Sequence, residues 1–93
     1  MRIIGEIPHP RLKITLFKMG GRVSVKLENA LGEQTYKLGD DERFQTPETV
    51  ALLLDEAFLE GVEKIMQAMR QNRLQALERL FPQSEENAFD EII

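Results

Sequence analysis

The sequence predicts an α+β fold in which a three-stranded antiparallel meander is covered on one face by a long helix, followed by a shorter C-terminal helical segment. Two alternating apolar segments joined by adjacent glycines predict the sheet, and later apolar residues at three- and four-residue steps predict the helix. The 93 residues, 42% hydrophobic and 30% charged, are typical of one small globular domain. We expect this domain to span residues 1–82, with an acidic, flexible tail at residues 83–93.

The first segment, MRIIGEIPHPRL, places two prolines around His9, the only histidine of the chain. Proline has no N–H to donate to a strand ladder, so we expect this segment at an edge of the sheet or leading into it. His9 has no second ligand or paired base nearby in the sequence. It is therefore expected to be a turn residue rather than a general base or a metal ligand.

The next segment, Arg11–Glu28, predicts a hairpin with a two-residue turn at residues 20–21. Adjacent glycines suit the positive-φ positions of such a turn, and the turn fixes the pairing of the two strands. Leu16 then lies opposite Val25 on the core face, whereas Phe17 points to the other face.

A third strand is predicted at Glu33–Leu38, after the turn-like sequence NALG. Two pairing registers keep Tyr36 on the core side of the sheet. We favour the register that places Lys37 opposite Glu28, because the other register opposes Lys37 to Lys26.

A helix is predicted to begin at Pro47, with Thr46 as its N-cap. Its apolar stripe consists of Val50, Leu53, Leu54, Ala57, Phe58, Gly61, Ile65 and Met69. Unbroken to Phe81, this helix would be about 52 Å long against a strand of about 27 Å. We therefore expect a bend or break in the polar run at 70–73, after which a shorter helical segment carries Leu74, Leu77, Leu80 and Phe81.

A second apolar ridge of the predicted helix, formed by Leu52, Leu59 and Met66 at seven-residue spacing, also needs a cover. The segment from Leu74 to Phe81 can fold back over it, or a second chain can cover it. We favour self-association and hence a homodimer.

The composition excludes several classes of chemistry. There is no cysteine, so disulfides, thiol catalysis and thiolate metal sites are ruled out. The longest apolar run, Val50–Leu54, is far shorter than a membrane span, and the N-terminus does not have the layout of a secretory signal. Without a nucleophile motif or clustered ligands, we expect a cytoplasmic protein that is not an enzyme and has no cofactor or metal.

The outer face of the predicted sheet mixes bases with exposed apolar side chains. Its candidate binding residues are Arg11, Lys13, Phe17, Met19, Arg22, Lys26 and Lys37. Such a face can be solvated, can be buried against another subunit, or can hold single-stranded nucleic acid by stacking and phosphate contacts. Nucleic-acid binding ranks lower because only one aromatic ring is present, whereas sheets that read RNA usually offer two or three.

The acidic tail carries Phe89, Ile92 and Ile93 at helical spacing. We expect this tail to be disordered. The alternatives are that these side chains dock on a partner or on the basic sheet face of the same protein.

The stretches IPHPRLKITLF (Ile7–Phe17) and EQTYK (Glu33–Lys37) resemble a family of small, uncharacterised bacterial proteins. The resemblance covers the chain up to about Phe81 and implies an intracellular bacterial protein, without an activity, a ligand or a functional residue. Our leading hypothesis is a non-catalytic protein–protein interaction or adaptor module that self-associates. The alternative is single-stranded nucleic-acid binding through the basic outer face of the sheet.

Overall fold

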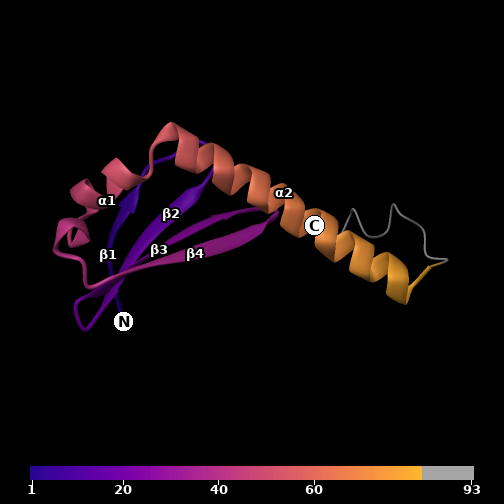
Figure 1. Ribbon diagram of the computed structural model, residues 1–93, viewed down its shortest axis with the longest axis horizontal. Helices are drawn as coiled ribbons and strands as arrows, with labels where there is room; N and C mark the ends of the chain where they lie inside the picture. Colours follow the sequence, from indigo (N-terminus) through magenta and orange to yellow (C-terminus); the bar gives the residue numbers. More distant parts are fainter. Residues whose placement is uncertain (83–93) are drawn as a thin grey trace.

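A computed structural model describes residues 1–82 and shows an antiparallel sheet with helices packed on one of its faces (Figure 1). The four strands, in spatial order, are β1 (Arg2–Ile7), β2 (Lys13–Met19), β3 (Arg22–Asn29) and β4 (Gly32–Gly39). They are followed by the 3₁₀ turn η1 (Glu42–Phe44) and by the helices α1 (Pro47–Leu53) and α2 (Glu56–Leu80). The predicted α+β class, antiparallel sheet and long helix are confirmed.

The hairpin β2–β3 has the predicted register. Gly20 and Gly21 both have positive φ, at 55° and 83°, as a primed two-residue turn requires. Leu16 accordingly lies opposite Val25, and Phe17 lies on the opposite face of β2.

The prediction of three strands was wrong, because β1 pairs with β2 as a fourth strand at the edge of the sheet. Both prolines follow β1, so they end the strand without interrupting its ladder. The register shifts between Ile3 and Gly5, which obscures the alternating pattern. A Cβ on Gly5 would lie 2.7 Å from Cγ of Pro47, so β1 and α1 approach each other closely at this glycine.

The register of β3 and β4 also differs from both predicted alternatives, since Tyr36 lies opposite Val25. The connection is a two-residue turn directly after Asn29, whose side-chain Oδ1 accepts hydrogen bonds from the N–H groups of Leu31 (2.8 Å) and Gly32 (3.3 Å). The side chain of Asn29 therefore stabilises the turn that goes with this register. The displacement from either prediction is an even number of residues, so every side chain keeps its predicted face.

The core lies between the inner face of the sheet and the two helices. Its buried residues are Leu12, Ile14, Leu16, Val23, Val25 and Leu27 from the sheet side, and Val50, Leu54, Val62 and Met66 from the helices and the break between them. Tyr36 packs edge-on against Phe58, and the amide of Gln34 donates a hydrogen bond to the carbonyl of Val62 (2.8 Å). These contacts fix α2 to β4.

The predicted break at 70–73 was wrong, because the helix is interrupted at Leu54 and Asp55 instead. Asp55 accepts a hydrogen bond from the N–H of Phe58 (2.8 Å) and thereby caps a new helix. The polar run at 70–73 holds no glycine or proline, so it continues the helix. The segment predicted as a shorter second helix is the end of α2, which is about 37 Å long and projects beyond the sheet (Figure 1).

The ridge of Leu52, Leu59 and Met66 is not a single surface. Met66 is fully buried, Leu59 packs against the core, and Leu52 is exposed on α1. The interruption at Leu54 breaks the helical phase on which the seven-residue spacing depended. Met66 therefore has no surface to offer to a second chain in this fold.

Candidate functional site: the outer face of the sheet

The face of the sheet turned away from the helices contains a groove of about 740 Å³. We call it the sheet groove. It is lined by Met1, Phe17, Met19, Arg22, Val23, Ser24, Lys26, Thr35, Lys37, Leu38, Gly39 and Asp40. Three lining residues are basic and one is acidic, and several of the others are apolar.

Five of the seven predicted binding residues line this groove, namely Phe17, Met19, Arg22, Lys26 and Lys37. The other two lie elsewhere. Arg11 donates a hydrogen bond from Nε to Oε1 of Glu63 on α2 (2.6 Å), and Lys13 lies opposite Glu28 at the far end of the β2–β3 ladder. The alternation of β2 and β3 predicted the shared face, but the groove occupies only the half near the Gly20–Gly21 turn.

Met1 is a lining residue that the sequence did not suggest. The pairing of β1 with β2 brings the N-terminus to this face, where Ile3 lies opposite Phe17 and is largely exposed. Because the sequence did not predict a fourth strand, it did not indicate that Met1 and Ile3 would lie on the same face of the sheet as Phe17.

The aromatic ring of the groove is paired with a cation. Nζ of Lys26 lies 5.5 Å from the ring centroid of Phe17, within the range of a cation–π interaction. Met19, two residues further along β2, is 63% exposed. An apolar platform is therefore available at the surface beside a positive charge.

Charge is distributed unevenly along the outer face. Lys26 Nζ lies 3.8 Å from carboxylate oxygens of both Glu28 and Glu33, which face each other across β3 and β4, and it offsets their repulsion. Arg22 and Lys37 make no ion pair with any residue of the described part of the chain. These two cations are free to meet an anionic ligand at the end of the groove where Phe17 and Met19 lie.

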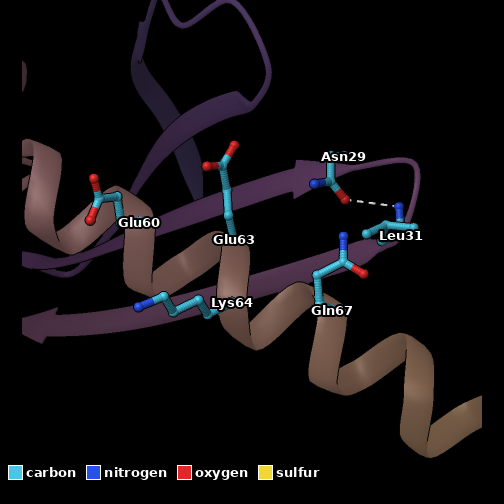
Figure 2. A pocket seen from close by; sticks show the side chains of 6 residues that line it. All are labelled: Asn29, Leu31, Glu60, Glu63, Lys64 and Gln67. Carbon is cyan, nitrogen blue, oxygen red and sulfur yellow. Dashed lines mark hydrogen bonds between the residues drawn. The ribbon is translucent and has the colours of Figure 1, made fainter.

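A second hollow, of about 390 Å³, lies between α2 and the β3–β4 turn (Figure 2). It is lined by Asn29, Leu31, Glu60, Glu63, Lys64 and Gln67. Two of its polar groups already have structural roles: Asn29 holds the turn, and Glu63 accepts a hydrogen bond from Arg11, which lowers the pKa of Glu63. This hollow is smaller than the sheet groove, and none of the predicted binding residues lines it.

His9 has the role of a turn residue. Its Nδ1 accepts hydrogen bonds from the backbone N–H groups of Arg11 (3.1 Å) and Leu12 (3.2 Å), so this ring nitrogen holds the loop between β1 and β2. Among residues 1–82, no group of three or more His, Cys, Asp or Glu side chains is arranged to hold a metal ion.

None of the helices in the described part of the chain is long and apolar enough to cross a membrane. The tail residues Phe89, Ile92 and Ile93 lie outside the described residues. Comparisons of the chain with protein-family models, curated proteins and solved structures found no match.

Proposed function

We propose that this protein binds single-stranded nucleic acid in the sheet groove. The observation that carries the proposal is that Arg22 and Lys37, which make no ion pair within residues 1–82, line the same groove as Phe17 on the sheet face turned away from the helices. Phosphates are attracted to the two cations, and an unstacked base packs on the ring. Lys26 also lies near that ring, but its charge is already shared with Glu28 and Glu33, so Arg22 and Lys37 are the cations offered to phosphate.

A single strand fits this site better than a duplex. Residues 1–39 hold seven bases and three acids, whereas the whole chain has a net charge of −4. Tight binding of duplex requires a concentrated basic footprint over many phosphates, and this chain has only a local one. A single strand exposes its bases and gains affinity from apolar contacts as well as from charge.

The test is a fluorescence-anisotropy titration of a labelled oligothymidine with the full chain at two salt concentrations. We expect the double variant Arg22→Glu with Lys37→Glu to lose at least tenfold in affinity and to show a weaker salt dependence. Phe17→Ala should lose about fivefold to a hundredfold, the range for removal of a stacking partner.

The matched control for the charge reversal is Lys64→Glu with Arg79→Glu, which changes the net charge equally at two exposed positions of α2. This control should bind like the natural chain. Equal binding by the groove variant and the control would remove the sheet groove as the nucleic-acid site.

A second candidate is the self-associating adaptor, favoured by the exposed apolar side chains of α2 and its end. These are Ile65, Met69, Leu80 and Phe81, which are 38–69% exposed. At 100° per residue, Ile65, Met69 and Leu80 lie along one side of α2, and this side continues past the sheet. A second α2 packed on that side would give a homodimer.

Light scattering of the full chain tests this candidate. The adaptor proposal expects twice the mass of one chain and a return to the single mass in Met69→Glu with Leu80→Glu. Leu52→Glu, an equally drastic change at an exposed position of α1, serves as the control. A natural chain that scatters as a monomer at high concentration would rule out the dimer.

A further inference from the structure

The segment at residues 83–93, QSEENAFDEII, has a chemistry that matches the sheet groove. It carries four acids and no base, together with the apolar residues Phe89, Ile92 and Ile93. Like a single-stranded nucleic acid, it combines repeated negative charge with side chains that pack on apolar surface. The two classes of ligand would therefore meet the same groove residues.

The sheet groove offers positive charge for the acids of this segment and apolar surface for its apolar side chains. Arg22 and Lys37 can face the carboxylates, because neither makes an ion pair within residues 1–82. Phe17, Met19 and Leu38 supply apolar surface for a phenylalanine and for isoleucines. An ion pair at this exposed face is weak alone, so the apolar contacts must contribute much of the affinity.

The path of α2 makes it difficult for the segment to reach the groove of its own chain. Gly32, at the β3–β4 turn, lies against Met69, and α2 then continues for about 16 Å to Leu80, away from the sheet (Figure 1). In the other direction, Lys37 lies about 17 Å along β4 from Gly32.

The two distances add to about 33 Å along this path, and the path must also turn round the edge of β4 to the outer face. The nine residues from Leu80 to Phe89 span at most about 32 Å when fully extended. Phe89 of the same chain therefore approaches Lys37 only when the intervening residues are almost fully extended, whereas the segment of another molecule has no such constraint.

We infer that residues 83–93 of one copy of this protein bind in the sheet groove of a second copy and compete there with nucleic acid. The inference rests on the proposed function for its regulatory meaning, because the segment would then lower the affinity for nucleic acid. The contact itself, between residues 83–93 of one copy and the sheet groove of another, does not require nucleic acid.

The first experiment measures docking directly. A fluorescein-labelled peptide of sequence QSEENAFDEII is titrated with the full chain carrying Phe89→Ser and Ile92→Ser, so that the protein's own segment competes poorly. We expect saturable binding, and at least a tenfold loss of affinity when Arg22→Glu and Lys37→Glu are added. The pair Lys64→Glu and Arg79→Glu should leave binding unchanged. A peptide that does not bind, or that binds the groove variant equally well, overturns the inference.

The second experiment tests whether the segment acts between molecules. A chain with Arg22→Glu and Lys37→Glu has a disabled groove and an intact segment, so adding it unlabelled should displace the peptide from the first protein. The same chain with Phe89→Ser and Ile92→Ser added should displace far less. Equal displacement by both would overturn docking of the segment from a second copy.

Oligothymidine separates this inference from the proposed function. If the oligonucleotide binds in the groove while the peptide does not, the inference fails and the proposed function stands. If the peptide binds through Arg22 and Lys37 while the oligonucleotide neither binds nor displaces it, the proposed function fails and the docking contact stands. Displacement of bound peptide by the oligonucleotide supports both. The charge-reversed positions lie on the exposed face, and circular dichroism of each variant checks that the fold is retained.

Discussion

The two faces of the sheet are built from the same strands and are under different constraints. The inner side chains along the middle of β2 and β3 are aliphatic and buried, as in Leu16 and Val25. The outer side chains of the same strands mix cations, small polar groups and apolar groups, as in Arg22, Ser24 and Phe17. Packing against the helices explains the buried inner residues, whereas Phe17 and Met19 lie on the outer face without a helix to cover them. This outer composition is therefore the part of the sheet to which our functional proposal applies.

The sharpest test of this contrast compares two neighbours on β2 that point to opposite faces. Leu16→Ala removes a fully buried side chain and should lower the free energy of unfolding by about 2–5 kcal/mol. Phe17→Ala, on the half-buried outer side, should cost less than half as much and should act mainly on oligonucleotide binding. Urea denaturation measures both free energies. Equal losses would mean that the outer face also belongs to the core.

A pair of glycines shows how tightly the inner side is packed. Gly5→Ala should cost about 1–3 kcal/mol, because the added methyl group would meet the Pro47 ring of α1. Gly61→Ala, where the added Cβ meets no atom within 4 Å, should stabilise α2 by about 0.5–1 kcal/mol. Thermal unfolding of the two variants should shift in opposite directions. A stabilising Gly5→Ala would show that β1 and α1 are less closely packed than the structure has them.

The helices that cover the inner face depend on their caps. Asp55→Ala removes the side chain that accepts from the N–H of Phe58 and should lower stability by about 1 kcal/mol. Asp55→Asn keeps an acceptor and should recover most of that loss. Chemical denaturation compares the two variants. An Asn variant as unstable as the Ala variant would assign the effect to charge rather than to capping.

The smallest effect is expected from acid, at the connection between β4 and α1. Arg43 donates side-chain and backbone hydrogen bonds to the Asp41 carboxylate, and these lower its pKa to about 2 from the ordinary value of 3.8. A depressed pKa stabilises the fold where the carboxylate is ionised in both states, so this contribution is complete well above pH 3.8 and is lost as pH falls towards 2. The loss of Tm over this range should be smaller in Asp41→Asn than in the natural chain. Parallel acid profiles would contradict this role of Asp41.

Much of the sheet followed from local rules. The primed turn at residues 20–21 needs positive φ at both positions, which glycine adopts without a steric penalty, and the alternation of β2 and β3 then assigned every side chain to a face. Thr46 and Pro47 correctly predicted the start of α1, because an N-cap and a proline at the first helical position act within one turn of helix. Five of the seven predicted outer-face residues accordingly line one groove.

The other features depended on contacts between segments that are distant in sequence. β1 is a strand because β2 presents an unpaired edge to it, and the turn held by the Asn29 side chain accompanies a register that charge pairing did not favour. Asp55 rather than the polar run at 70–73 interrupts the helix, and this change of phase turned Met66 inward and left Ile65 partly exposed.

The sequence by itself therefore determined the class of fold, the β2–β3 hairpin and the side of the sheet on which each of its residues lies. These depend on turn geometry and on a two-residue period, both of which are local. Only the tertiary structure decided which of the outward residues gather in one groove and which surface of α2 remains open. Those outcomes depend on strand pairing and on helix phase after a break, which are set by packing across the whole domain.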